Sequence, residues 1–412
     1  MKRTSFALCF VLAFFAIISC NGNSGSGGLR IGIWDTNQEG AIVAVLKDFT
    51  AETGINVSVE VTPWDQYWTL LEAATTGGVL PDVFWGHTDT IIRYMSNGIL
   101  MDLTDRIVAS SVTDMSNFPR PLVELYSYNN RNYGIPKDFG LIALWYNKKL
   151  FDEAGLAYPD GIWNWDDLRN AAQKLTSNGV YGYASVPDGQ NGYWQFVFQN
   201  NGWIISKDWT TSGYDDPRTI EALQFAVDMV SDGYSPSAAD FAENPVEALF
   251  SSGVVAMAQI GSWMVPEMNR HDYVVANAGV AVLPSGRDGT RASNMNGLGW
   301  VANAKTKYPD ETWKLLEFLS REDIQRRLSE SGIAISAFNG TTEGWVRSFP
   351  HFDLSPYAEQ IPYGFATPTS RNSAPWQRMS SDMLLKAWIG DITVEDACKE
   401  IAQRMNQMLA LE

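Results

Sequence analysis

Apolar and polar positions follow two alternating periods along the first hundred residues of the chain. Every-second-residue alternation predicts strands at 29–33, 55–61 and 82–85, because neighbouring side chains of a strand point to opposite faces. Between them, apolar residues at helical spacing predict helices over 42–49 and 67–74. This order of strands and helices predicts a parallel sheet with right-handed crossovers. A ligand of such a sheet lies beyond the carboxyl ends of its strands.

The stretch from Tyr133 to Leu175 carries the clearest boundaries. An apolar run predicts a strand over 139–146, and the residues 135–138 before it are typical of a crossing between two lobes. Asn147 is then expected to cap a helix that stops at Gly155, and Asn164 to cap a second helix.

The same reading of the remaining chain predicts an α/β protein of two lobes. The predicted elements are a helix over 220–230, a buried strand ending at 260, strands at 280–283 and 299–302, a helix around 313–319, a crossing at 333–338, and terminal helices over 379–388 and 393–408. We expect each lobe to hold a mixed, mainly parallel sheet flanked by helices, with a hinge of several segments. The N-terminal lobe is assigned residues 29–137 and 279–332, and the C-terminal lobe residues 138–278 and 333–412.

The N-terminus has the pattern of an export signal. Basic residues at 2–3 precede an apolar run over 6–18 that is too short to span a bilayer comfortably. The end of this run resembles a bacterial lipobox, so we predict a signal peptide over 1–19, lipidation of Cys20 and a flexible Gly/Ser tether over 20–28. A signal anchor and a plain signal peptide are the alternatives. The mature protein would be held at the outer face of the cytoplasmic membrane, in the periplasm if the host has an outer membrane.

Composition narrows the function. A net charge of −17 argues against nucleic acid and anionic membrane surfaces as partners, because both would be repelled. After removal of the signal and lipidation, only Cys398 remains as a thiol, so no intrachain disulfide is expected. The three histidines (87, 271 and 351) stand apart from residues at metal-ligand spacing, and no nucleophile elbow or phosphate loop is present. We therefore expect neither a cofactor nor a metal, and a protein that is not an enzyme.

The sixteen tryptophans of the chain suggest what it binds. Sugar rings have apolar faces that stack on aromatic planes and hydroxyl rims that need carboxylates, amides and guanidinium groups. Any single tryptophan is explained equally well as a buried core residue or as a ligand contact. Six of them lie at turns beside polar residues, and we expect at least three to line a cleft: Trp34, Trp64, Trp85, Trp194, Trp263 and Trp376.

The string YNKKLFDEAGL at 146–156, followed by a tryptophan-rich helix start at 163–165, resembles the hinge region of extracellular solute-binding proteins (family 1) of ABC importers. Within that family it is similar to the sugar-binding branch that includes the maltodextrin binders. The resemblance implies a two-lobe fold like that of the type II periplasmic binding proteins. It also implies a carbohydrate ligand, a membrane permease as partner, and a monomer.

Matching segments along the chain imply site residues. The string PDVFWGH at 81–87 resembles a strand end where a tryptophan contacts sugar, although Thr88 and Asp89 stand where that family has Asp-Arg. The loop 34–39 corresponds to a polar contact loop, and residues 367–397 to the C-terminal segment. This resemblance and the pattern of indoles at turns together give the ligand-binding candidates Trp34, Asp35, Glu39, Trp64, Trp85, Thr88, Asp89, Asp138, Trp194, Trp263, Arg371 and Trp376. The carboxylate of the family does not align cleanly with Asp138.

The resulting hypothesis is a lipid-anchored subunit that captures a mono- or oligosaccharide between its lobes for an ABC transporter. One alternative is a binding protein for a non-sugar solute such as a polyamine, because acidic aromatic clefts also hold cations. A second alternative is a secreted carbohydrate-active enzyme. Such an enzyme needs two carboxylates that flank the scissile bond, and the chain has too many acidic residues to exclude such a pair by counting alone.

Overall fold

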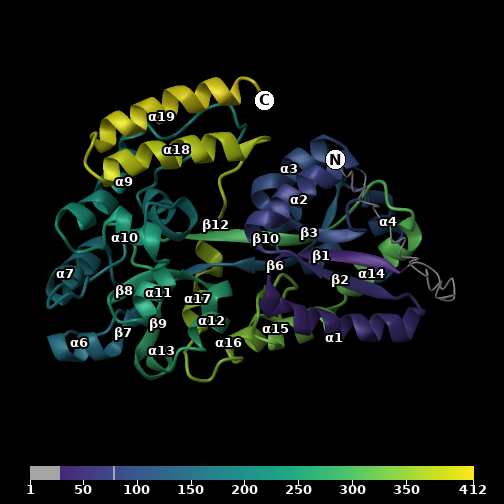
Figure 1. Cartoon of the computed structure of the whole chain (residues 1–412), viewed down its shortest axis with the longest axis horizontal. Helices are drawn as coiled ribbons and strands as arrows, with labels where there is room; N and C mark the ends of the chain where they lie inside the picture. Colours follow the sequence, from purple (N-terminus) through teal and green to yellow (C-terminus); the bar gives the residue numbers. More distant parts are fainter. Residues whose placement is uncertain (1–27, 78) are drawn as a thin grey trace, which may run out of the picture.

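The computed structural model describes residues 28–77 and 79–412, and it consists of two α/β lobes that lie side by side along the longest axis (Figure 1). The predicted signal peptide, Cys20 and most of the tether lie outside the described residues. No helix in the described part of the chain combines the length and the apolar character that crossing a bilayer requires.

The N-terminal lobe is built on a mixed sheet. The strand order is β11-β6-β10-β3-β1-β2, and the first three strands along the chain, β1, β2 and β3, pair in parallel as predicted. β10 runs antiparallel to both β3 and β6. The strands span Leu29–Ile33 (β1), Val57–Val61 (β2), Val83–His87 (β3), Gly134–Gly140 (β6), Ser293–Ala302 (β10) and Ile335–Ser336 (β11).

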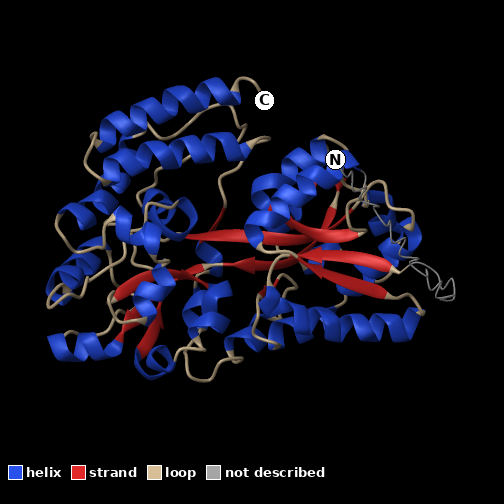
Figure 2. Cartoon of the chain, viewed as in Figure 1, coloured by secondary structure: helices blue, strands red, loops and turns tan. Residues whose placement is uncertain are grey.

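Helices cover both faces of this sheet (Figure 2). In Figure 1, α1 and α15 lie below the sheet, and α2 and α3 lie above it. The helices of this lobe span Thr36–Thr53 (α1), Trp64–Gly77 (α2), Thr88–Ser96 (α3), Thr104–Ala109 (α4), Arg120–Leu125 (α5), Pro309–Leu319 (α14) and Glu322–Glu330 (α15).

The C-terminal lobe holds a small antiparallel sheet of order β8-β7-β9, with strands Ile142–Asn147 (β7), Met257–Gly261 (β8) and Ala278–Ala281 (β9). The expectation of a mainly parallel sheet is wrong for this lobe. Residues 148–256, between β7 and β8, contain several helices rather than a single crossover helix. The chain can therefore return to the sheet from either end, and β8 and β9 run opposite to β7.

Helices surround this small sheet. The longer ones span Trp165–Leu175 (α7), Pro217–Ser231 (α9), Ser373–Trp388 (α18) and Val394–Leu409 (α19). The shorter ones span Lys148–Ala154 (α6), Trp194–Gln199 (α8), Ala238–Glu243 (α10), Val246–Ser251 (α11), Val265–Met268 (α12), Asp272–Asn277 (α13) and Ser355–Glu359 (α17). Thr342–Val346 (α16) packs against α15 and β11 of the N-terminal lobe.

The predicted helix boundaries are confirmed at the positions where capping residues were identified. The side chain of Asn147 accepts a hydrogen bond from the backbone N–H of Leu150, and Gly155 ends α6 with φ of 64°. Asn164 forms a capping box with Asp167 at the start of α7. These caps work through atoms within a few residues of one another, so the local sequence is enough to place them.

The predicted strand over 139–146 is two strands that meet at Leu141, where the chain passes from one sheet to the other. The backbone N–H of Ser262 donates to the Leu141 carbonyl at 2.9 Å, and this holds the bend against the end of β8. Beyond the bend, side chains alternate between two cores. Ala143 and Trp145 face the core shared with the N-terminal lobe, and Leu144 faces the core of the C-terminal lobe.

Candidate functional site

A cleft of about 570 Å³ lies between the two lobes. Its N-terminal wall comes from the ends of β1 and β3 and the starts of α1 and α2, and its C-terminal wall from loops beside β8 and α8. β6 and β10 form its floor. The lining residues are Trp34, Asp35, Asn37, Gln38, Trp64, His87, Asp138, Phe139, Gly140, Asp188, Gln190, Asn191, Ser262, Trp263, Met264, Asn296, Leu298 and Ala334.

The N-terminal wall is an aromatic cluster centred on Trp34. Its ring centroid lies 5.1 Å from that of Trp64, 5.1 Å from that of Tyr67 and 4.7 Å from that of Trp85, each in an edge-to-face arrangement. The Tyr67 hydroxyl donates to the carbonyl of Trp85 at 2.9 Å and so ties α2 to β3. Trp64 is 42% exposed while Trp85 is fully buried, so the cluster offers an apolar surface supported from beneath. Such a surface suits a sugar face.

Polar groups stand beside these indoles at the start of α1. Asp35 caps the helix by accepting a hydrogen bond from the backbone N–H of Asn37 at 2.9 Å. The Gln38 side-chain amide donates to the second Asp35 carboxylate oxygen at 3.2 Å. The three side chains line the cleft together, because a strand end followed by a capped helix turns consecutive polar residues toward the same side.

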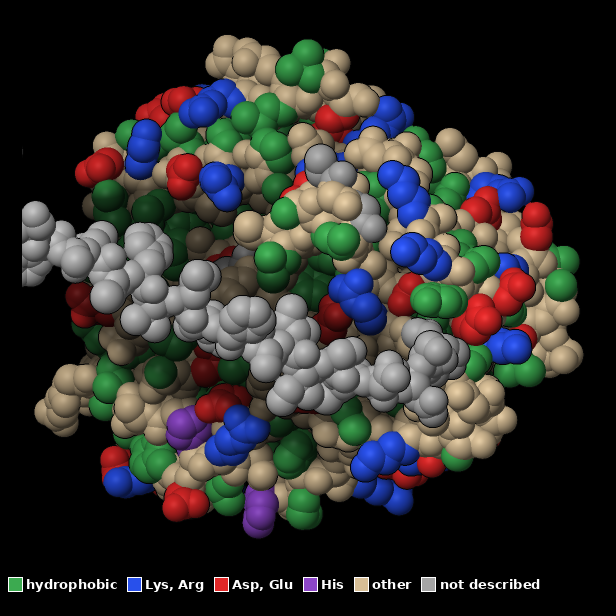
Figure 3. Space-filling view, turned by 45° about the vertical axis from the view of Figure 1, so that its right-hand side comes forward, with side chains coloured by type: hydrophobic (Ala, Val, Ile, Leu, Met, Phe, Trp, Pro, Cys, Tyr) green, Lys and Arg blue, Asp and Glu red, His purple; other side chains and the backbone are tan. Residues whose placement is uncertain are grey.

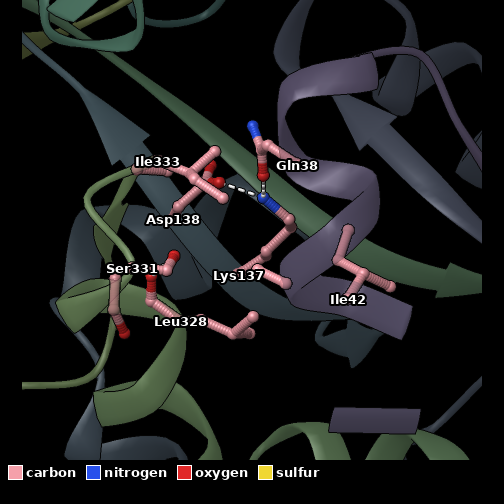
Figure 4. A pocket seen from close by; sticks show the side chains of 10 residues that line it. Gln38, Ile42, Lys137, Asp138, Leu328, Ser331 and Ile333 are labelled. Carbon is pink, nitrogen blue, oxygen red and sulfur yellow. Dashed lines mark hydrogen bonds and ion pairs between the residues drawn. The ribbon is translucent and has the colours of Figure 1, made fainter. Parts of the chain in front are cut away.

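Asp138 on β6 adds a carboxylate at the floor, and it is buried beside Lys137 (Figure 4). The two side chains form an ion pair. Burial raises the pKa of the Asp138 carboxyl from its ordinary value, and the charge of Lys137 and its hydrogen bond to the carboxylate oppose that rise.

The C-terminal wall presents one indole, that of Trp263, in the turn Ser262–Met264 after β8. The ring lies directly against two glycines. A β-carbon at Gly140 would come within 2.5 Å of the Trp263 ring, and one at Gly261 would be closer still. Any larger residue at these positions would displace the ring, so the glycines set where the indole meets the cleft.

The rest of this wall is a polar loop, the turn Gly189–Tyr193 that precedes α8, together with Asp188 before it. Asp188 accepts a hydrogen bond from the backbone N–H of Asn191 at 2.7 Å. The Gln195 amide donates to the carbonyl of Gln190 at 2.5 Å, and its oxygen accepts from the backbone of Asn294 at 2.7 Å. These bonds fasten the loop to β10 in the cleft floor.

A hydrogen bond bridges the cleft mouth: the Arg270 guanidinium donates to the Asn37 side-chain oxygen at 2.5 Å. Arg270 also pairs with Glu267 in α12, and its side chain is exposed. The described lining contains carboxylates from both lobes, at Asp35, Asp138 and Asp188, and contains no lysine or arginine.

Of the twelve ligand-binding candidates, the structure brings five together in the cleft: Trp34, Asp35, Trp64, Asp138 and Trp263. Their contact with a ligand stays a prediction. Four of the five follow a strand end or a turn, where the sequence pattern placed them.

Three further tryptophan candidates lie away from the cleft surface. Trp85 is buried beneath Trp34. Trp376 is fully buried in the C-terminal core, where its indole N–H donates to the Ser370 hydroxyl at 2.9 Å. Trp194 is 6% exposed and lines an adjoining cavity of about 250 Å³, which shares Asp188 with the cleft. We do not include Trp85 and Trp376 in the proposed site, because neither ring reaches the cleft.

The remaining candidates are polar and also lie elsewhere. Thr88 is buried and lines a separate groove between α3, α5 and the strand β12 (Gly364–Ala366). Glu39 is exposed on the outer side of the first turn of α1. Arg371 is exposed and donates to the backbone carbonyl of Glu412 at 2.7 Å. Asp89 belongs to the first turn of α3, and the structure does not describe its side chain.

Sequence reasoning missed several lining residues. His87 lies at the last position of β3, two residues after Trp85, so both point to the same face and the later one reaches the cleft. Gln38 faces the cleft one turn into α1. Asp188, Gln190 and Asn191 precede α8 in a glycine-rich turn, which was the available signal for an exposed loop.

The site shows no arrangement for metal chemistry. Within residues 28–77 and 79–412, no three His, Cys, Asp or Glu side chains gather as a metal-ion site. Cys398 is buried in the C-terminal core, and burial raises the pKa of its thiol to about 12, so the thiolate required of a nucleophile is disfavoured. The geometry described is that of a binding cleft lined by aromatic and polar side chains.

A sequence model of the family described as bacterial extracellular solute-binding protein matches residues 35–326, more than half of the chain. The chain belongs to this family. Its members are binding proteins of transporters rather than enzymes. The identification made from the hinge string is confirmed, and the family is one of extracellular proteins.

Named relatives of the solute-binding protein are similar over most of its length. The arabinooligosaccharide-binding protein of Halalkalibacterium halodurans is 25% identical over 310 residues, covering 73% of this chain and 67% of that one. The galactooligosaccharide-binding protein of Bacillus subtilis is 24% identical over 339 residues, covering 78% and 77%. An ABC substrate-binding protein from Listeria monocytogenes, solved in complex with cycloalternan, superposes with a TM-score of 0.86 at 24% identity, covering 93% of this chain and 99% of that chain. The predicted two-lobe fold is confirmed.

Proposed function

We propose that this solute-binding protein is the lipid-anchored, substrate-capturing component of an ABC transporter for a carbohydrate, a mono- or oligosaccharide bound in the cleft between its lobes. The observation that carries the proposal is the pairing of aromatic faces with fixed carboxylates and amides from both lobes. Trp34 and Trp64 on one wall and Trp263 on the other offer ring-stacking surfaces. The lining carboxylates accept hydrogen bonds from hydroxyl groups.

The size of the cleft supports a ligand larger than a single small solute. Its volume of about 570 Å³ lies inside the range of roughly 300–1,000 Å³ typical of sites that enclose drug-sized ligands. The adjoining cavity beside Trp194 extends it by about 250 Å³. An oligosaccharide is consistent with the relatives named for such ligands.

The two-lobe architecture supports delivery of the bound sugar to a membrane permease. We propose the lobe division 29–137 with 279–332 and 138–278 with 333–412, adjusted at its edges because β6 and β11 pair in the N-terminal sheet and β9 pairs in the C-terminal sheet. A bound sugar favours the closed arrangement because it contacts both walls at once. The closed monomer would dock on a membrane permease, tethered through lipid on Cys20 after removal of residues 1–19.

Acidic and basic side chains are interspersed over the face seen in Figure 3, which argues against a strongly basic patch for nucleic acid on that face.

A thermal-shift screen of the purified protein tests the ligand class. The panel contains cycloalternan, maltodextrins, arabino-oligosaccharides and galacto-oligosaccharides, with spermidine as the amine comparison. We expect at least one saccharide to raise Tm and to change tryptophan fluorescence saturably, because ligand that binds only the folded state stabilises it. A response to spermidine without any response to saccharides would contradict the proposal and favour a polyamine binder.

Prolonged incubation of the protein with its bound saccharide distinguishes a binding protein from an enzyme. We expect the sugar to be recovered unchanged by chromatography. Shortened or newly reducing products that persist in protein purified to homogeneity would favour a carbohydrate-active enzyme instead.

A further inference from the structure

The side chain of Lys137 occupies an unusual position for a charged group, under the floor of the cleft and almost fully buried. Its ammonium group lies between the Asp138 carboxylate and the Gln38 side-chain oxygen, which it reaches at 2.7 Å (Figure 4). The ammonium also lies 4.3 Å from the ring centroid of Trp85, within the range of a cation–π contact. Three elements, α1, β3 and β6, therefore converge on one charge.

Each of these partners belongs to the cleft or supports it. Asp138 and Gln38 line the cleft directly. Gln38 accepts from Lys137 through its oxygen, so its amide nitrogen is turned toward Asp35, to which it donates at 3.2 Å. Trp85 supports the ring of Trp34 from beneath. One ammonium group thereby orients the acceptors Asp138 and Asp35, the amide between them and the stacking surface beside them.

Two serines, Ser331 and Ser336, also line the small cavity next to the ammonium group, but the hydrogen bonds of the ammonium go to Gln38 and Asp138. That cavity holds about 20 Å³ and is bounded by α1, β6 and the segment before β11, with Leu328, Ile333 and Ala334 as its apolar part. A space of this size admits about one water molecule. Lys137 is not among the residues that line the sugar cleft itself.

We propose that Lys137 is a positioning residue for saccharide binding, which fixes the orientation and charge of Asp138 and the orientation of Gln38 without touching the ligand. The inference rests on the proposed function, because the groups it positions are the predicted sugar contacts. A buried carboxylate that keeps its charge needs such a partner, since removing one member of a buried pair leaves the other uncompensated.

The proposal makes the pH dependence of binding informative. The charged and titratable groups that interact with Asp138 are Lys137 on its own strand, Asp35 at the start of α1, His87 at the end of β3 and the buried Tyr126 at the end of α5. The residues paired with Asp138 across the sheet, Leu298 on β10 and Ser336 on β11, carry no charge. Without Lys137, the carboxyl pKa rises further, so Asp138 takes up a proton as pH falls and loses its capacity as a double acceptor.

The test is isothermal titration of Lys137→Met with the panel saccharide that the wild-type protein binds most tightly. We expect Kd to be at least about tenfold weaker at about pH 7.5, and the ratio of variant to wild-type Kd to grow at about pH 5.5. Lys149→Met, at an exposed lysine of α6, is the matched control and should leave Kd unchanged.

A Kd for Lys137→Met within about twofold of wild type, or a ratio that is the same at both pH values, would overturn the proposal. If Lys137→Met does not fold, the Kd of Lys137→Arg is measured instead. The planar guanidinium keeps the charge but cannot reproduce the three contacts of the ammonium, so we expect Kd to weaken at least about threefold, and an unchanged Kd would overturn the proposal. Wild-type protein that binds no saccharide would instead refute the proposed function, and this inference with it.

Discussion

The two walls of the cleft are built in different ways. The N-terminal wall is a cluster of rings around Trp34 in which each ring is held by another and by the ends of a mixed sheet. The C-terminal wall has one indole, Trp263, seated on two glycines, and a polar loop fastened by Asp188 and Gln195. The first wall is a rigid apolar platform, and the second supplies a single ring and hydrogen-bonding groups. A ligand would therefore gain most of its apolar contact on the N-terminal side and much of its orientation on the C-terminal side.

The largest effect is expected from removing the centre of the platform. Trp34→Ala deletes a ring that contacts Trp64, Tyr67 and Trp85, so we expect a loss of unfolding free energy of about 3 kcal/mol and a weakening of Kd of roughly a hundredfold. Urea denaturation and calorimetric titration measure the two quantities. Tyr158→Ala, which removes an exposed ring of the opposite lobe, should leave Kd unchanged. An unaltered Kd in Trp34→Ala would contradict the platform.

A smaller effect is expected on the C-terminal wall from adding one methyl group. In Gly140→Ala, the new β-carbon would approach the Trp263 ring to 2.5 Å, so the ring must move away from its position in the cleft. We expect Kd to weaken roughly tenfold, which corresponds to about 1.4 kcal/mol. Gly161→Ala is the matched control, because a β-carbon there meets no atom within 4 Å. Equal affinities in the two variants would show that the position of the Trp263 ring does not affect binding.

The smallest effect on binding is expected at a tryptophan that belongs to neither wall. Trp376→Phe removes the hydrogen bond from the indole to Ser370 inside the C-terminal core, so we expect the unfolding free energy to fall by about 1 kcal/mol. Kd should stay the same, because the ring does not reach the cleft. A clear loss of affinity without loss of stability would place Trp376 in the binding site and contradict its assignment to the core.

Much of the candidate site could be predicted because part of it lies at strand ends. Trp34 and Asp35 follow a strand with a clear alternating pattern, and Trp64 is the first residue of a helix with a clear apolar stripe. Trp263 follows a buried strand and a Gly-Ser pair. In each case the local pattern fixes where the element stops, and the topology of the sheet turns that end toward the cleft.

The misplaced residue Trp376 and the missed residue Lys137 have different causes. Trp376 lies four residues into α18, where Ala374 and Gln377 line the adjoining cavity while Trp376 faces the C-terminal core. A helix start in sequence is known only to within a residue or two, and one residue turns a side chain by about 100°. The local sequence around Lys137 predicts only a crossing between lobes, and its burial depends on contacts with distant α1 and β3.

The sequence by itself determined the order of strands and helices, several of their caps and the family, since hydrophobic periods and capping side chains act over a few residues. Only the tertiary structure decided the antiparallel direction of the second sheet, the burial of Trp85 and Trp376, and the enclosure of Lys137 between α1, β3 and β6. These features depend on which distant segments pack against one another, and the free energy of burying an indole or a charge is set by those neighbours rather than by the adjacent residues.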